Sequence, residues 1–360
     1  MIKTKIKFFI APLLLSLLIN STSADAGQFE DWLTAYERGD FKMALSLLQP
    51  LADKGDPEAE YQLGEMYIIG AGVKQDTSIA NQWYDKAVNE FRKRAEQGDA
   101  RALYMTGQLY ALGRGDKKID RAEAFKLYQK AADQGYAPAQ FEVGTMYMVQ
   151  KGSLRVNYND AINHSDVEAM KWFQKAAAQG NADAEFYIGE FYGFGGTHED
   201  KNAEIKQNFD EADKWVHRAA EDGSIEAQMT LGTQEYIYGW NNTKKNGDEA
   251  VRLFEKVANQ PMLGDNARCS LGRIYEIGSI VPQDYAKAYM WDSLCALGRF
   301  QLKHFESKMT KSQIDNGKKL QQEWLSTHAG ADTWLKVNAA EFATLETNSE
   351  NDNSLLPAPR

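Results

Sequence analysis

The chain has 360 residues and a formal net charge of −10, and its composition argues against several classes of protein. Its acidic balance repels phosphate backbones, and it has no basic face interleaved with aromatic residues, so nucleic-acid binding is not expected. A hydrophobic content of 43% indicates a globular rather than a disordered protein.

The first 26 residues have the pattern of an export signal. Three lysines precede an apolar run over residues 8–19, and the small residues Ala24-Asp25-Ala26 suit cleavage before Gly27. The run is shorter than the roughly 20 residues that span a bilayer. We expect a cleaved signal peptide over residues 1–26, and a mature chain without a membrane span. Its net charge would be −12, since three Lys and one Asp are lost from the total of −10.

Two amphipathic segments follow the predicted signal peptide. The first contains Phe29, Trp32 and Tyr36 at helical spacing, and the second predicts a helix over residues 41–53. A terminal helix pair covers one side of a stack and exposes its other side. We therefore interpret residues 27–57 as N-terminal capping helices.

One pattern then recurs six times and organises the rest of the chain. Each copy contains Ala-x-x-x-(apolar or Thr)-Gly, and in five copies a Tyr follows the Gly by three residues. The copies of this motif are residues 59–64, 102–107, 139–144, 184–189, 227–232 and 267–272. A second segment of each copy carries a large residue, which is Trp83, Leu127, Trp172, Trp215, Leu253 or Trp291.

These spacings predict two antiparallel helices in each copy. Ala, Leu and Tyr at i, i+4 and i+8 lie on one face of a helix. The Gly lets the partner helix approach closely, despite a cost in helix propensity of about 1 kcal/mol. Since one pair cannot bury its own apolar face, neighbouring pairs must stack into an all-α array.

The first copy reads Ala-x-x-x-Leu-Gly-x-x-Tyr-x-x-Gly-x-Gly-Val-x-x-Asp-x-x-x-Ala-x-x-Trp-Tyr-x-Lys-Ala from Ala59 to Ala87. This motif resembles the Sel-one-like repeat, a relative of the tetratricopeptide repeat, and the resemblance covers about residues 40–330. It implies a right-handed α-solenoid of about six antiparallel helix-pair repeats with N- and C-terminal capping helices.

The boundaries that we expect follow the copies of the motif. The six repeats are residues 58–98, 99–135, 136–180, 181–223, 224–263 and 264–298. C-terminal capping helices take up residues 299–343, where Thr310 and Gln313 fit a capping box. The polar tail, residues 344–360, has the composition of a disordered segment.

The third and fourth repeats carry insertions between their two helices. Gly144 lies 28 residues before Trp172, whereas the matching spacing in the first repeat is 19. Insertions on one edge of a repeat array often mark a binding face. The candidate binding residues there are Leu154, Arg155, Tyr158 and His164 in the first insertion, and His198, Lys201 and Phe209 in the second. The alternative is that both are tolerated surface loops, which cost little stability.

The first helices offer a second candidate surface, a groove on the concave side of the array. The positions turned away from the buried stripe by helical angle mix apolar residues with carboxylates and amides, which suits an extended peptide. They are Gln62, Glu65, Ile69, Met105, Gln108, Leu112, Glu142, Thr145, Tyr187, Glu190 and Phe194. The alternative is that the apolar members pack between neighbouring helices.

The sequence contains no recognisable catalytic or metal-binding pattern. Its five His residues show no short metal-ligand spacing, and nucleophile elbows and phosphate-binding loops are absent. Some cysteine-rich relatives are associated with β-lactam binding or hydrolysis. They carry a Cys pair in nearly every repeat, and this chain lacks the Ser-x-x-Lys of penicillin-recognising enzymes. We therefore expect no enzyme activity, cofactor or metal, and the β-lactam reading is disfavoured.

Cys269 and Cys295 are the only cysteines. They lie near the start of the first helix and late in the second helix of one repeat, and antiparallel pairing brings these ends together. In an exported protein such a pair is expected to form a disulfide, whereas in a cytosolic protein both would be free thiols.

The resemblance implies a non-catalytic scaffold or adaptor of the bacterial envelope, located in the periplasm or secreted. Its partner would be a protein or peptide, bound through the groove or through the insertions of the third and fourth repeats, and the mature chain would be a monomer. An alternative is a secreted factor that engages a host protein.

Overall fold

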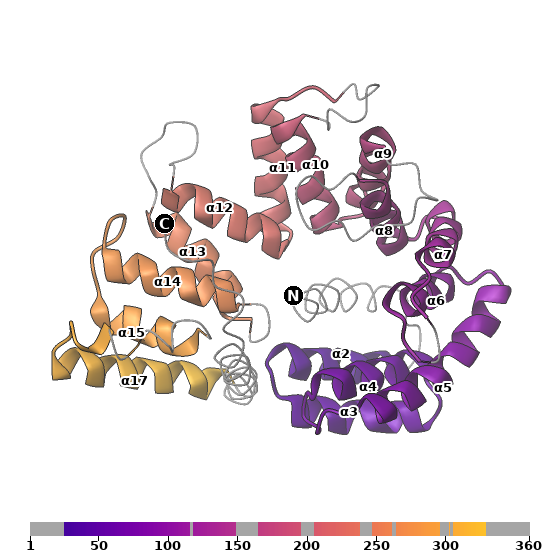
Figure 1. Ribbon diagram of the computed structural model, residues 1–360, viewed down its shortest axis with the longest axis horizontal. Helices are drawn as coiled ribbons and strands as arrows, with labels where there is room; N and C mark the ends of the chain where they lie inside the picture. The colour runs from indigo at the N-terminus through magenta and orange to yellow at the C-terminus, as the bar shows by residue number, and fades with distance from the viewer. Residues whose placement is uncertain are drawn as a thin grey trace, which may run out of the picture. The chain divides into compact units, whose positions relative to one another are not determined.

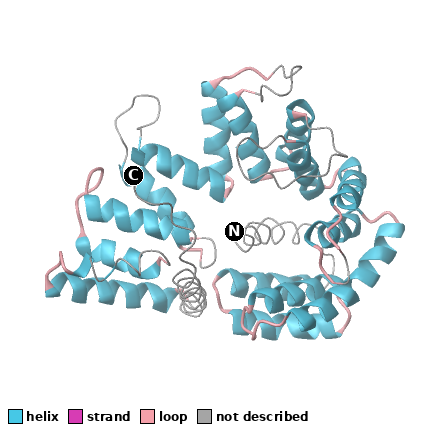
Figure 2. Cartoon of the chain, viewed as in Figure 1, coloured by secondary structure: helices cyan, strands magenta, loops and turns pink. Residues whose placement is uncertain are grey.

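The computed structural model describes residues 25–115, 118–148, 165–195, 205–237, 247–260, 264–295, 302 and 305–328. Within these ranges every regular element is a helix (Figure 2). The predicted all-α fold is therefore confirmed. The described residues form two compact units: 25–33 with 42–231, and 34–41 with the residues from 232 onward.

The helices of the first unit follow the predicted repeats (Figure 1). Helix α2 (Asp25–Glu37) begins in this unit and ends in the second. The helices that follow are α3 (Phe41–Asp53), α4 (Pro57–Ile69), α5 (Thr77–Glu96), α6 (Ala100–Leu112), α7 (Arg121–Asp133), α8 (Ala137–Tyr147), α9 (Asp166–Ala177), α10 (Ala182–Phe194) and α11 (Phe209–Glu221). The helix predicted over residues 41–53 coincides with α3.

The second unit contains the later repeats. Helix α12 (Ile225–Ile237) connects the two units in sequence. The remaining helices are α13 (Gly247–Ala258), α14 (Asp265–Ile277), α15 (Tyr285–Leu294) and α17 (Lys311–Thr327). None of the helices in the described part of the chain has the length and apolarity that crossing a membrane requires.

Helix pairs pack in chain order. Within repeats, α4 contacts α5, α6 contacts α7, α8 contacts α9, α10 contacts α11, and α14 contacts α15. Successive repeats meet through α5 with α6, α7 with α8, α9 with α10, and α13 with α14. This is the stacking that the sequence predicted, because each pair leaves an apolar face for its neighbour to cover.

The motif glycine of each first helix lies against a side chain of the second helix. A Cβ atom at Gly107 would lie 2.6 Å from the ring of Tyr128, and one at Gly144 would lie 2.7 Å from the ring of Phe173. Gly64 meets Tyr84 in the same way. Such distances are shorter than real Cβ contacts, so only Gly permits this approach.

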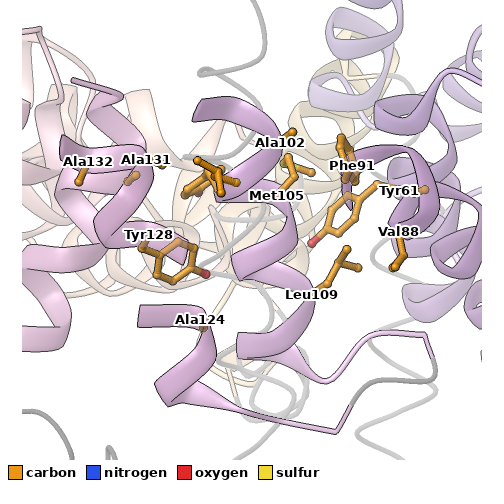
Figure 3. Packing of buried hydrophobic residues seen from close by; sticks show 14 of the residues in the cluster. Tyr61, Val88, Phe91, Ala102, Met105, Leu109, Ala124, Tyr128, Ala131 and Ala132 are labelled. Atoms are coloured by element: carbon orange, nitrogen blue, oxygen red, sulfur yellow. The ribbon is translucent and has the colours of Figure 1, made fainter. Parts of the chain in front are cut away.

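The aromatic residues behind Gly64 and Gly107 belong to one hydrophobic core cluster (Figure 3), and Phe173 behind Gly144 belongs to a second one. In three successive repeats a ring from the first helix packs against a ring from the second. The ring centroids are 5.6 Å apart for Tyr61 and Tyr84, 5.5 Å for Tyr104 and Tyr128, and 5.8 Å for Phe141 and Phe173. These separations lie in the range of favourable aromatic pairs.

A recurrent hydrogen bond closes five of the helix pairs in the described part of the chain. The backbone N–H of the residue that caps the second helix donates to the carbonyl of the motif tyrosine. The N···O distances are 3.0 Å for Asp76 and Tyr67, 3.0 Å for Asp120 and Tyr110, 2.9 Å for Ser165 and Tyr147, 2.8 Å for Asn208 and Tyr192, and 3.0 Å for Asp284 and Tyr275. The third and fourth repeats keep this bond, so their insertions leave the closure of the pair unchanged.

Side chains at one motif position join successive repeats. Gln140 Nε2 donates to the carbonyl of Ala132 at 3.2 Å, and Gln228 Nε2 donates to that of Ala220 at 2.9 Å. In each case the acceptor is near the C-terminus of the preceding second helix, where carbonyls lack partners within their own helix.

The second unit is fastened at its C-terminal end by several contacts. Cys269 and Cys295 form a disulfide with their Cα atoms 5.3 Å apart. The predicted capping box is present, since Gln313 Oε1 accepts from the Thr310 N–H at 2.8 Å and Thr310 Oγ1 accepts from the Gln313 N–H at 3.3 Å. Helix α17 packs on α15.

Three predicted segments lie outside the described residues in whole or in part. They are the signal peptide over residues 1–24, the C-terminal capping helices over residues 329–343, and the polar tail, residues 344–360. All three stay predictions.

Gly107→Ala is expected to lower the free energy of unfolding by about 1–3 kcal/mol. A methyl group there overlaps the Tyr128 ring, and this overpacking exceeds the gain of about 1 kcal/mol in helix propensity. Thermal unfolding followed by circular dichroism measures the change. Gly193→Ala in α10 is the matched control, because its Cβ would meet only Ala212 at 3.7 Å. Equal effects of the two substitutions would contradict the close-approach argument.

Replacing Cys269 and Cys295 by Ser is expected to destabilise the second unit by about 3 kcal/mol, because the disulfide closes a loop with a sequence separation of 26. Urea unfolding of the oxidised chain and the double variant measures the difference. Mass spectrometry of the unreduced mature chain is the control, because it shows whether the two cysteines are oxidised. Two free thiols in that chain would contradict the predicted disulfide.

Candidate functional site

The structure places the predicted groove residues in two classes. Gln62, Glu65, Met105 and Gln108 are buried, with 1–4% of their surface exposed. The remaining seven residues, Ile69, Leu112, Glu142, Thr145, Tyr187, Glu190 and Phe194, are partly or fully exposed. Helical angle alone was therefore wrong about the orientation of the first four, because it ignores side chains that the next repeat supplies.

Glu65 shows how the next repeat covers a groove position. Tyr84 donates its hydroxyl hydrogen to Glu65 Oε1 at 2.6 Å. Arg114, in the loop that follows α6, donates from Nε to Oε1 at 3.0 Å and from Nη2 to Oε2 at 3.2 Å. The guanidinium also lies 5.6 Å from the centre of the Tyr84 ring. This two-point contact neutralises a buried carboxylate and fastens the second repeat to the first.

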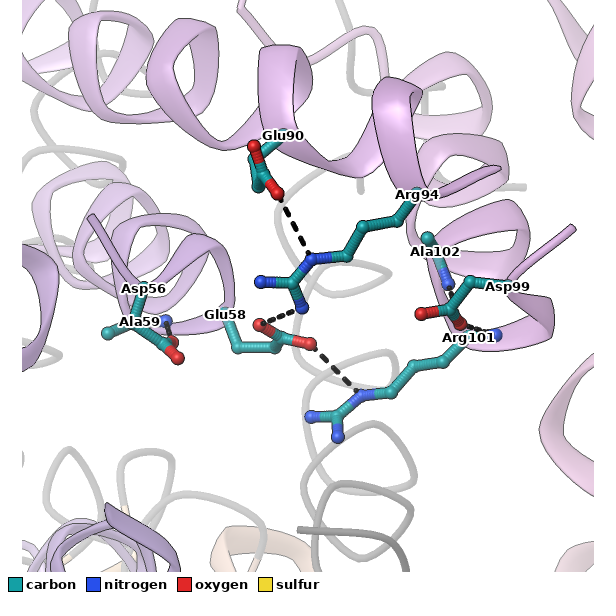
Figure 4. A network of polar contacts seen from close by, with 8 residues as sticks. All are labelled: Asp56, Glu58, Ala59, Glu90, Arg94, Asp99, Arg101 and Ala102. Atoms are coloured by element: carbon teal, nitrogen blue, oxygen red, sulfur yellow. Dashed lines mark hydrogen bonds and ion pairs between the residues drawn. The ribbon is translucent and has the colours of Figure 1, made fainter. Parts of the chain in front are cut away.

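A second network of ion pairs neutralises a buried carboxylate and joins the first two repeats at the N-terminal ends of α4 and α6 (Figure 4). Buried Glu58 pairs with Arg101 Nε at 3.3 Å and with Arg94 Nη1 at 3.8 Å. Arg94 also contacts Glu90 at 3.4 Å. Arginines from both neighbouring helices therefore surround this carboxylate.

The carboxylates of the third to fifth repeats have different surroundings. Gln108 Nε2 donates to Tyr104 at 3.0 Å and to Glu142 Oε1 at 3.3 Å, and Thr145 Oγ1 donates to the Glu142 carbonyl at 2.8 Å. Within the described chain no Lys or Arg side chain forms an ion pair with Glu142, Asp183, Glu190 or Glu226.

Burial and mutual repulsion favour the neutral form of these acids. Burial raises the pKa of Glu142 to about 7, and the charge of Asp183 adds to this against the hydrogen bonds from Gln108 and Thr145. Burial, with the charge of Asp183, also raises the pKa of Glu226 to about 7. Burial raises the pKa of Asp183 and of Glu190 as well. An opposite charge placed among them would restore the ionised form.

Of the binding residues predicted in the two insertions, the structure describes only Phe209. Leu154, Arg155, Tyr158, His164, His198 and Lys201 lie outside the described residues. Phe209 is the first residue of α11, and 57% of its surface is exposed. Phe194, the last residue of α10, is 76% exposed.

One group in the described chain has metal-ligand atoms close together. Ligand atoms of Asp265, Cys269 and Cys295 lie within 4.8 Å of one another, but the two sulfurs are joined in the disulfide. A disulfide sulfur cannot act as a thiolate ligand, so this group does not form a metal site in the oxidised chain.

The sequence analysis did not identify Arg114, Tyr128, Asp183 or Glu226 as site residues. A signal for two of them was present, since the position before the motif alanine is acidic at Glu58, Asp183 and Glu226. The role of Arg114 had no such signal, because it depends on which loop of the next repeat meets Glu65.

Comparison with known proteins identifies the repeats. A family model described as the Sel1 repeat matches residues 57–90, 100–136, 137–181, 182–224, 225–261 and 266–291. These segments make up more than half of the chain and coincide with the repeats of the structure. No curated protein matches the chain.

Several solved structures are similar. A Sel1 repeat protein from Oxalobacter formigenes is 25% identical, with a TM-score of 0.48, over 75% of this chain and 98% of that one. The c5321 protein of uropathogenic Escherichia coli, described as a protective antigen displaying an SLR fold, is 22% identical, with a TM-score of 0.39, over 93% and 73%. Immunity protein Pa5087 of Pseudomonas aeruginosa is 18% identical, with a TM-score of 0.43, over 79% and 82%.

Stability is expected to fall as pH rises from 5 to 7.5. Glu142 and Glu226 have pKa values of about 7 in the folded chain against an ordinary 4.5, so the folded state binds more protons in this interval. Their contribution to the free energy of unfolding is fully present below about pH 4.5 and is lost as the pH rises through 7. The loss is on the order of 2 kcal/mol for each group. Chemical denaturation at a series of pH values measures this dependence. Glu60, Glu185 and Asp292 have pKa values raised in the same way, so the double variant E142Q/E226Q should reduce the dependence without abolishing it. Stability that rises with pH would contradict the sign.

Proposed function

Since this chain belongs to the Sel1 repeat family, we propose that it is a non-catalytic protein-interaction scaffold of the bacterial envelope. Proteins built from Sel1 repeats generally act as such scaffolds, and the family is typically non-catalytic. The observation that carries the proposal is the stack of matched repeats, joined by arginine–carboxylate and glutamine–carbonyl contacts. Such an array offers an extended surface rather than a catalytic pocket.

Two observations support an envelope location. The N-terminal pattern is that of a cleaved export signal near Ala26. The Cys269–Cys295 disulfide supports the same location, because disulfides form and persist in oxidising compartments such as the periplasm or the exterior of the cell. The mature chain would act there as a monomer.

Two surfaces are candidates for the partner. The first is the exposed part of the predicted groove on α8 and α10, where Phe194 and partly exposed carboxyl groups lie, together with Glu226 of α12. The second is the edge that carries the insertions of the third and fourth repeats, with Phe209 at its base. Both surfaces belong to neighbouring repeats, so one extended partner could contact them together.

In-cell crosslinking and pull-down of the full-length exported chain tests the proposal. The comparison variant replaces residues 149–164 by the sequence of residues 69–75, and residues 195–207 by that of residues 70–75. These are the matching loops of the first repeat, and the Tyr147–Ser165 and Tyr192–Asn208 hydrogen bonds set their ends.

A discrete protein captured by the full chain is the expected result. Its loss from the variant would assign binding to the insertions, and its retention would assign binding to the face of the first helices. Absence of any partner with the full chain would contradict the scaffold function.

A further inference from the structure

Six residues on three consecutive first helices form one acidic face. Asp183, Tyr187, Glu190 and Phe194 are spaced by four, three and four residues on α10, so they form one stripe along that helix. Glu142 of α8 and Glu226 of α12 lie beside it. Burial raises the pKa of Tyr187, and the charges of Glu226, Asp183, Glu142 and Glu190 all add to this. Tyr187 therefore lies among all four carboxyl groups.

The acidic face differs from the first two repeats in the ion pairs that its carboxylates form within the described part of the chain. In the described chain Glu65 is paired with Arg114 at 3.0 Å and Glu58 with Arg101 at 3.3 Å. Among the residues that the structure describes, no Lys or Arg forms an ion pair with any of the four carboxylates of the acidic face. Carboxylates brought together without a counter-charge cost free energy, and an external cation would relieve that cost.

A buried hydroxyl next to the acidic face gives a second, independent indication. Tyr128 is 2% exposed, and its hydroxyl makes no hydrogen bond in the described chain. It lies within the electrostatic influence of Glu142. Oε1 of Gln108, which is hydrogen-bonded to Glu142 through Nε2, is also buried without a partner. A donor and an acceptor are thus both unsatisfied beside Glu142, which is unusual for buried polar groups.

The first repeat contains the completed form of this arrangement. Tyr84 occupies the position of Tyr128, and its hydroxyl donates to Glu65 while Arg114 donates to the same carboxylate. The second repeat has Gln108 in place of Glu65. A guanidinium or ammonium held by Glu142 would supply the cation that Arg114 supplies to Glu65.

The extent of the acidic face favours a peptide over a single ion. Asp183 and Phe194 are eleven residues apart on one helix, which corresponds to about 16 Å. An extended chain covers this length with about five residues. The stripe ends at Phe194, whose ring is 76% exposed and is suited to an apolar side chain.

We propose that the acidic face binds a cationic segment of a protein partner. In this segment one Arg or Lys side chain pairs with Glu142 and another with Glu226, on the two sides of Tyr187, and a neighbouring apolar side chain contacts Phe194. Charge complementarity selects this occupant. The inference depends on the scaffold function proposed above and specifies the chemistry of its partner.

Fluorescence anisotropy with the mature chain and defined peptides tests the inference. The probe is a labelled ten-residue peptide of alternating Arg and Leu, with a Glu–Leu peptide for comparison, at pH 7.5 and two salt concentrations. We expect the Arg–Leu peptide to bind and E142Q/E226Q to weaken its binding by about tenfold or more. The matched control E123Q/E211Q removes the same charge from second helices and should change binding less than about twofold.

The apolar part of the face is tested in the same assay. Phe194→Ser should weaken binding of the Arg–Leu peptide by about threefold or more, whereas Ile119→Ser, at a side chain that is 59% exposed outside the face, should not. Equal losses in test and control variants, or equal binding of the Glu–Leu peptide, would overturn the proposal. The proposal would also be overturned if the chain bound Mg²⁺, Ca²⁺ or spermidine but not the peptide, and if E142Q/E226Q abolished that binding.

The pull-down separates this inference from the proposed function. If the full chain and E142Q/E226Q capture the same partner equally well, the scaffold function stands and the acidic face is excluded as its site. If neither captures a partner, the scaffold function itself fails. Circular dichroism of each variant confirms that the repeats remain folded.

Discussion

In each repeat of the first unit the backbone at the motif glycine lies against a side chain of the second helix, and a Cβ atom there would overlap that side chain. This steric constraint fixes the distance between the two helices of a pair. With the distance fixed, the aromatic rings of both helices come into contact, and the cap of the second helix reaches the carbonyl of the motif tyrosine. The sixth repeat keeps the constraint with another side chain, since Asp292 takes the place of the ring at Gly272.

Once the pairs are fixed, the contacts between repeats are largely polar. Gln140 and Gln228 reach back to the carbonyls of the preceding helix, and Arg114 and Arg101 reach back to Glu65 and Glu58. These contacts satisfy groups that stacking would otherwise leave buried and unpaired. The interior of the array is therefore held by specific partners as well as by apolar contact.

The same carboxylate-bearing helices have two kinds of environment along the chain. In the first two repeats arginines of this chain pair with Glu65 and Glu58. In the third to fifth repeats Glu185 is paired with Arg218, whereas Asp183 acts on Glu142 and Glu226, and burial shifts these acids towards the neutral form. The paired carboxylates stabilise the contact between the first two repeats, whereas the carboxylates of the acidic face can accept a cation from an external partner. This difference is the basis of the proposal for the acidic face.

The sequence alone determined the repeat, its helix pairs, the close approach at glycine, the capping box at Thr310 and the pairing of Cys269 with Cys295. All of these depend on contacts within one repeat, where spacing along the chain fixes which side chains meet. It could not decide which groove positions are buried. Glu65 and Gln108 have exposed angles on an isolated helix, but Arg114 and Glu142 of the next repeats cover or bind them. Contacts between repeats depend on the relative placement of successive pairs, and only the tertiary structure supplies that placement.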